Sequence, residues 1–133
     1  MEREWETETL VGLLERTAAS FGERTAVVDR LERMTYAELL DASKRIAGFF
    51  FAHSIEKGDR VIVQMPNSVM FEVVCFALFS LGALPVFILP MHREHVIEAL
   101  CEVHLVGRNL AVHCTSNRMP SDSLCHPSGS HNV

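Results

Sequence analysis

The chain has no excess of positive charge. Its 133 residues include 12 Lys and Arg against 17 Asp and Glu, which gives a formal net charge of −5. The basic side chains are scattered along the sequence instead of gathering in a stripe, so the electrostatic footprint that a nucleic acid requires is missing. We therefore expect no nucleic-acid partner.

A segment long enough to cross a membrane is also lacking. Val73–Leu89 is a run of 17 residues without a formal charge, whereas a bilayer core requires about 20 apolar residues. Ser80, Gly82 and Pro85 interrupt this run where a soluble helix would end and pass into a strand. A membrane-associated protein is thus the least favoured functional hypothesis, and we expect no membrane partner.

The sequence shows neither a secretory signal nor the cysteine spacing of a metal site. Residues 2–8 are acidic, without the positive and apolar regions of a signal peptide. No Cys-x-x-Cys pair occurs among Cys75, Cys101, Cys114 and Cys125. Because nothing indicates an oxidising compartment, we expect reduced thiols and a cytoplasmic location.

What is present is the composition of a globular domain, with 48% apolar and 22% charged residues. Apolar residues recur at offsets of three and four after Thr9, which predicts a helix with one buried stripe, ended by Gly22. The stripe consists of Leu10, Leu13, Leu14, Ala18 and Phe21. Thr25–Val28 and Met34–Thr35 flank a polar segment and predict a short hairpin.

A second helix is predicted to begin after Thr35, because Thr35 and Glu38 have the spacing of a capping box. Asp41, Lys44 and Arg45 should face water. The expected core face consists of Tyr36, Leu39, Leu40, Ile46, Ala47 and Phe50. Phe49 and Phe51 do not fit on that face, which predicts burial of this helix on more than one side.

Residues 60–93 carry the clearest pattern of the chain: strand, helix, strand. Val61–Val63 is an unbroken apolar run of the kind found in strands covered on both faces. Pro66–Ser68 offers a bend and a helix cap, and the helical stripe that follows ends near Gly82. Pro85–Leu89 then reads as a strand. This unit predicts an α/β fold, a partial open parallel sheet with packed helices.

The composition changes near residue 103. Residues 1–103 carry 10 basic and 16 acidic side chains, whereas residues 104–133 carry only Arg108, Arg118 and Asp122. We expect an ordered region 1–103, with a further helix at Glu94–Cys101, and an irregular, poorly ordered tail 104–133. A short strand at Leu105–Val112 is the one element expected in the tail.

Three motifs resemble the N-terminal part of the adenylate-forming enzymes. Met34–Leu39 is similar to the early Tyr-x-Glu-Leu motif of that family, and Leu81–Val86 to its second motif, the turn into a strand. Val63–Ser68 is similar to its strand-to-helix junction. Gly82–Phe87 with Leu89–Arg93 resembles the aryl acid-activating branch, typified by 2,3-dihydroxybenzoate-AMP ligase. The resemblance covers residues 8–103.

The resemblance implies an activity that this chain by itself is not expected to have. Such enzymes join a carboxylic acid to ATP, release pyrophosphate and pass the acyl group to a thiol; they use ATP and Mg²⁺. Aryl members activate 2,3-dihydroxybenzoate or salicylate and load a phosphopantetheinyl carrier protein in siderophore biosynthesis. The phosphate loop, the acidic groups for magnesium and ribose, and the lysine of the C-terminal lid match no position here.

We therefore predict an inactive fragment of an aryl acid ligase with no catalytic, cofactor-binding or metal residues, produced by a frameshift, an alternative transcript or a faulty gene model after Val103. The alternative is a small interaction module that pairs with a ligase or a carrier protein through its sheet edge.

Four further features admit a functional interpretation beside a simpler one. The cluster His104, His113, Cys114, Cys125 and His126 could bind a metal, but its spacing favours an incidental origin. His92 and Arg93 could hold an anion, although a surface turn is favoured. Cys75 could be a nucleophile, although its apolar neighbours favour a core position. Residues 128–130 lack the strand and lysine of a phosphate loop.

Overall fold

The computed structural model describes residues 8–89, 91, 109–113 and 124–125. In chain order the elements are α1 (Leu10–Phe21), β1 (Thr25–Val28), β2 (Arg33–Thr35), α2 (Tyr36–Ala52), β3 (Arg60–Gln64), α3 (Val69–Leu81), β4 (Leu84–Ile88), β5 (Asn109–His113) and β6 (Leu124–Cys125). They form a two-stranded hairpin, β1–β2, and a four-stranded sheet of order β4-β3-β5-β6.

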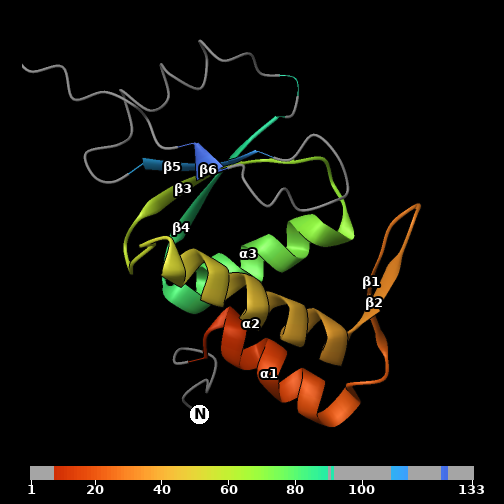
Figure 1. The fold of residues 1–133 in the computed structure, drawn as a ribbon. Coiled ribbons are helices and arrows are strands. Elements are labelled where there is room, and N and C mark those ends of the chain that lie inside the picture. Colours follow the sequence, from red (N-terminus) through yellow and green to blue (C-terminus); the bar gives the residue numbers. More distant parts are fainter. Residues whose placement is uncertain (1–7, 90, 92–108, 114–123, 126–133) are drawn as a thin grey trace, which may run out of the picture.

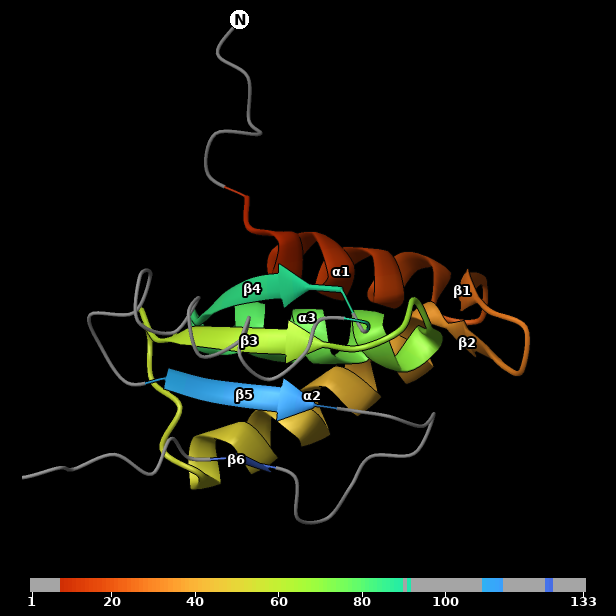
Figure 2. The ribbon, with the colours of Figure 1, turned by 90° about the horizontal axis from the view of Figure 1, so that it is seen from above.

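The described helices lie on one face of the sheet. Figures 1 and 2 show α3 directly against the strands, α2 packed beside α3, and α1 as the outermost element. The hairpin projects from one end of the helical layer (Figure 1). This layered arrangement confirms the predicted α/β class.

The predicted parallel sheet is also present. β3 pairs in parallel with β4 through Val61↔Pro85 and with β5 through Val61↔Leu110. β5 overlaps the strand expected at Leu105–Val112. The antiparallel pairing of β6 with β5 was not predicted. The division of the chain near residue 103 stays a prediction. The expected helix at Glu94–Cys101 lies outside the described residues.

The core is divided into two clusters of buried side chains. The larger joins β3 and α3 to the second half of α2, and in it Val61 and Val63 are fully buried. The smaller joins α1, the hairpin and α3 to the first half of α2, and its buried side chains include Leu14, Leu39 and Val73. β3 is thus the buried strand that its apolar run predicts.

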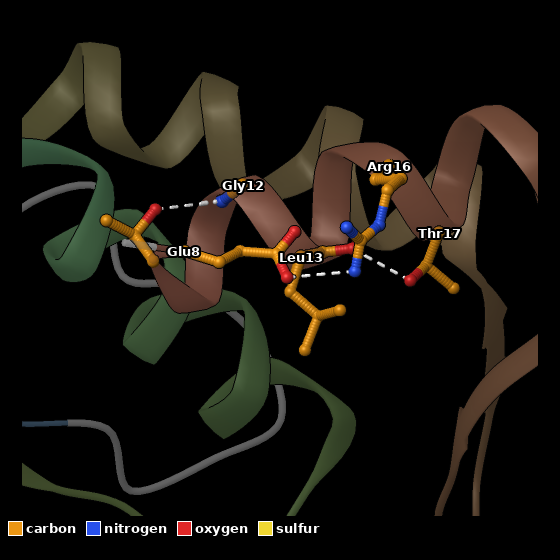
Figure 3. A network of polar contacts seen from close by, with 6 residues as sticks. Glu8, Gly12, Leu13, Arg16 and Thr17 are labelled. Carbon is orange, nitrogen blue, oxygen red and sulfur yellow. Dashed lines mark hydrogen bonds and ion pairs between the residues drawn. The ribbon is translucent and has the colours of Figure 1, made fainter. Parts of the chain in front are cut away.

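Helix α1 begins and ends as predicted, but most of its apolar stripe is not buried. The side chain of Thr9 accepts a hydrogen bond from the amide of Gly12 at 3.0 Å, and Arg16 reaches back to Glu8 at 2.8 Å (Figure 3). Only Leu14 is buried; Leu10, Leu13 and Phe21 are 57%, 43% and 52% exposed. The prediction of one buried stripe was wrong because α1 is the outermost layer and covers its neighbours along one narrow line.

Helix α2 has the predicted capping box. The amide of Glu38 donates to the Thr35 hydroxyl at 3.3 Å, and the Glu38 carboxylate accepts from the amide of Thr35 at 2.8 Å. Leu39, Ala47 and Phe50 are buried on the expected face.

The burial predicted for Phe51 is wrong, since this side chain is 70% exposed. Adjacent helical residues point about 100° apart, so the burial of Phe50 directs Phe51 toward water. Phe49 is half-buried and its ring lies against that of Phe50 with centroids 6.1 Å apart.

Gly82 ends α3 in the left-handed region, with φ of 69°. The turn brings the amide of Gly58 within 2.9 Å of the Gly82 carbonyl and the amide of Leu84 within 2.7 Å of the Asp59 carbonyl. A residue with a side chain would be strained at this φ. The glycine therefore fixes the point at which β4 starts beside β3.

One carboxylate connects the hairpin to the start of α3. Asp29 accepts hydrogen bonds from the amides of Leu31 and Glu32 within its own turn, at 2.8 and 2.9 Å. Its second oxygen accepts from the amide of Val69, forty positions further along the chain, at 2.9 Å. These three amides, that of Val69 foremost, lower the pKa of Asp29. Hydrogen bonds from Thr35 likewise lower the pKa of Glu38.

These two carboxylates predict a loss of stability in acid. Each has a lower pKa in the folded chain than in the unfolded chain, so the unfolded chain binds protons first as the pH falls. Stability should be complete above the ordinary carboxyl pKa of about 4 and should decrease below it. Asp29→Asn should lower the melting temperature at pH 7 and flatten the dependence of the free energy of unfolding on pH between about 5 and 3.

The matched control is Asp41→Asn, which removes the same charge from an exposed position on α2. Thermal unfolding followed by circular dichroism at several pH values gives both comparisons. An Asp29→Asn variant with the melting temperature and the pH profile of the parent would contradict the structural role of Asp29.

A buried hydroxyl on α2 gives a second prediction. Ser43 is 1% exposed, and its Oγ has no hydrogen-bond partner among the described residues. Burying an unpaired hydroxyl is unfavourable, and alanine is the better helix former. Ser43→Ala should therefore raise the free energy of unfolding by about 0.5–1 kcal/mol.

Chemical denaturation measures this change. Ser20→Ala, at an exposed position of α1, reports the helix-propensity component alone. A Ser43→Ala variant less stable than the parent would show that the hydroxyl is satisfied.

Candidate functional site

The topology singles out one edge of the sheet. After β3 the chain crosses to β4 on one side, and it later enters β5 on the other side of β3. In open α/β sheets, ligands bind outside the carboxyl ends of the strands at such a switch point. The candidate site is therefore the carboxyl edge, which we define as residues 64–68, at and after the end of β3, together with Leu89 after β4 (Figure 2).

A buried side chain joins the ends of the two strands at this edge. Gln64, the last residue of β3, is 3% exposed, and its Nε2 donates a hydrogen bond to the Leu89 carbonyl oxygen at 3.2 Å. A buried amide requires hydrogen-bond partners, and the Leu89 carbonyl is one partner of Gln64. Gln64 thus holds the segment after β4 against the end of β3.

The start of α3 lies at the same edge, and protein groups already occupy two of its free amides. The amide of Phe71 donates to the Ser68 hydroxyl at 3.3 Å, as the predicted cap requires, and that of Val69 donates to Asp29 at 2.9 Å. A helix start binds anions through amides of this kind. Because the Asp29 carboxylate already accepts a hydrogen bond from the Val69 amide, the start of α3 has a structural role.

The side chains that face water at this edge are uncharged. Pro66 and Asn67 are exposed, and residues 64–68 contain no group that ionises near neutral pH. An amide such as that of Asn67 can orient a ligand by hydrogen bonding, but it cannot transfer a proton or attack an electrophile. The carboxyl edge can therefore position a ligand without providing chemistry of its own.

Cys75 occupies the core position that its neighbours favour. The residue is 5% exposed within α3. Burial, with a smaller contribution from the charge of Glu72, raises the pKa of the Cys75 thiol to about 12. A nucleophilic cysteine needs the opposite shift, so this thiol is unsuited to catalysis.

The other candidates fall mainly outside the described residues. This applies to His92 and Arg93, to His104, Cys114 and His126, and to residues 128–130; of His113 and Cys125 the backbone alone is described, in β5 and β6. Within the described part, no group of three or more His, Cys, Asp or Glu side chains could hold a metal ion. None of the helices in that part is long and apolar enough to cross a membrane.

Sequence reasoning missed two residues that organise the edge, Asp29 and Gln64. The polar segment 29–32 predicts a turn but not its bond to Val69, because a contact over forty positions leaves no local pattern. Gln64 reads as the polar end of an apolar strand. A polar residue within an otherwise buried run is the one signal that could have identified it.

The arrangement matches known proteins. The family described as AMP-binding enzyme matches residues 14–118. The chain is 45% identical over 98 residues to a 2,3-dihydroxybenzoate-AMP ligase of Bacillus subtilis, covering 74% of this chain and 18% of that enzyme. It is 39% identical over 94 residues to a salicyl-AMP ligase / salicyl-S-ArCP synthetase of Mycobacterium tuberculosis, covering 67% of this chain and 17% of that enzyme.

A solved structure agrees with these relatives. The apo structure of MbtA from Mycobacterium smegmatis superposes with a TM-score of 0.67 and 38% identity, covering 72% of this chain and 18% of that chain. The chain thus spans about a fifth of the length of the proteins it matches. Because the family match extends over most of its residues and coincides with the observed fold, the chain belongs to the AMP-binding enzymes.

Proposed function

We propose that this chain is the N-terminal part of an AMP-forming ligase that activates an aryl acid, 2,3-dihydroxybenzoate or salicylate. The observation that carries the proposal is the 45% identity over 98 residues to a 2,3-dihydroxybenzoate-AMP ligase. The second relative, a salicyl-AMP ligase, supports the same class of substrate. The reaction would join the carboxylate to ATP with release of pyrophosphate, and would then pass the acyl group to a phosphopantetheinyl carrier protein of siderophore biosynthesis.

Within such an enzyme this segment would act as scaffold. The carboxyl edge presents uncharged groups, Pro66 and Asn67, and its helix start is capped by Ser68 and Asp29. ATP and Mg²⁺ require a phosphate-binding loop and acidic ligands, and the described residues contain no group of three or more His, Cys, Asp or Glu side chains that could hold a metal ion. We infer that the chain alone does not catalyse adenylation, and that it works in the cytoplasm, where ATP is available.

An exchange assay tests the inferred lack of activity. The purified chain, incubated with ATP, Mg²⁺ and either 2,3-dihydroxybenzoate or salicylate, should show no pyrophosphate exchange above the buffer background. The intact Bacillus subtilis ligase serves as the positive control under the same conditions. Turnover by the purified chain that depends on the aryl acid would contradict its role as an inactive scaffold.

The neighbouring nucleotide sequence tests the origin of the chain. If a frameshift separates it from the rest of a ligase, translation in the other two reading frames beyond codon 103 should reveal a phosphate-binding loop and a C-terminal lid lysine. Genomic sequence without those motifs in any frame would contradict a fragment produced in this way and would favour a separate small protein.

A further inference from the structure

One exposed side chain at the carboxyl edge can itself be attacked: the carboxamide of Asn67. Asn67 lies in the bend between β3 and α3, and its side chain makes no hydrogen bond within the described residues. The backbone nitrogen of the residue that follows an asparagine can attack the carboxamide carbon, most readily when that residue has a small side chain. Here the following residue is Ser68, so the sequence at this point meets the requirement.

The attacking nitrogen is not held by a hydrogen bond. Ser68 accepts from the amide of Phe71, at 3.1 Å on its carbonyl oxygen and at 3.3 Å on its hydroxyl. Its own amide donates to no partner in the described part of the chain. The backbone of Ser68 is extended, with φ of −150° and ψ of 166°, because this residue precedes the first turn of α3. The helix start thus orders Ser68 without engaging its nitrogen.

No other asparagine of the chain has this combination. The remaining three are each followed by a larger side chain, Leu, Arg or Val: Asn109, Asn117 and Asn132. Asn109 also lies in β5, where the extended backbone of a paired strand keeps a side chain away from the next amide. Asn109 is therefore an internal reference for the reactivity of Asn67.

We propose that Asn67 is a site of spontaneous deamidation in the folded chain, with water as the co-reactant. The Ser68 nitrogen forms a bond to Cγ of Asn67, the bond from Cγ to Nδ2 breaks, and ammonia leaves with the Ser68 amide proton. Water then opens the resulting cyclic imide. Attack of water at Cγ gives aspartate, and attack at the backbone carbonyl carbon gives isoaspartate. The inference is independent of the proposed function, because it uses the chemistry of two adjacent residues.

Either product changes the electrostatics of the carboxyl edge. Residues 64–68 carry no charge, and the reaction places a carboxylate directly before the cap at Ser68. The next amide, that of Val69, already donates to Asp29 at 2.9 Å. The helix dipole attracts a second negative charge at this end of α3, whereas the Asp29 carboxylate repels it. Deamidation therefore converts an uncharged edge, which tolerates an anionic ligand, into an edge that repels one.

Mass spectrometry measures the reaction. The purified 133-residue chain is incubated at mildly alkaline pH, below its melting temperature, and the conversion of each asparagine is quantified after proteolysis. Asn67 should convert several-fold faster than Asn109. The rate should rise with pH, because loss of the Ser68 amide proton activates the attacking nitrogen. Isoelectric focusing should show a more acidic species that accumulates at the same rate.

Two variants test the mechanism. Ser68→Thr keeps a hydroxyl that can cap α3, but its β-branched side chain crowds the attacking nitrogen. It should slow the conversion of Asn67 several-fold and leave that of Asn109 unchanged. Asn67→Gln should not form the acidic species, because glutamine must close a larger ring. Circular dichroism and the melting temperature establish that both variants are folded.

Conversion of Asn67 that is no faster than that of Asn109 would overturn the proposal. This comparison is made within one molecule and needs no variant. Equal conversion of Asn67 in the parent and in a folded Ser68→Thr variant would overturn the proposed route. Conversion in urea but not in the folded chain would show that the fold protects Asn67, which also contradicts the proposal.

Discussion

The burial of β3 is the constraint on which the rest of the structure depends. Val61 and Val63 are inaccessible to solvent, and they can be so only if strands lie on both sides and helices cover the face to which they point. β4 and β5 provide the sides, and α2 and α3 provide the cover. Parallel strands require a crossover connection, which here is α3 between β3 and β4. Ser68 caps the start of this helix, and the left-handed turn at Gly82 ends it. The position of the carboxyl edge is thus a consequence of how one short strand is enclosed.

The sequence correctly predicted the features that are determined by residues close together in the chain. The capping box of Thr35 and Glu38, the cap at Ser68 and the stop at Gly82 depend on residues within a few positions of one another, and all occur as expected. The parallel arrangement was predicted from the apolar run Val61–Val63, because a strand with one face in water would alternate apolar and polar residues. Within the candidate site the cap at Ser68 was predicted, whereas the bonds that organise the edge were not.

The errors arise where burial depends on what lies opposite. Helical spacing placed Leu10, Leu13 and Phe21 on one face of α1. It does not indicate how much of that face is covered by neighbouring elements, and all three side chains are exposed. Phe51, also predicted to be buried, is exposed because α2 is packed on the side of Phe50. The bond from Val69 to Asp29 and the bond from Gln64 to the Leu89 carbonyl join segments that are distant in the chain. Such contacts are specified by the tertiary arrangement, which periodicity does not encode.

The same arrangement explains how the described part of the chain holds its fold. The buried side chains of the larger core cluster all come from the stretch between Ala47 and Ala83. Three polar side chains hold the geometry of the carboxyl edge: Asp29 and Ser68 accept hydrogen bonds from amides of α3, and Gln64 donates to the Leu89 carbonyl. Acyl activation requires charge placed where charge develops. Residues 64–68 at the carboxyl edge carry no such charge.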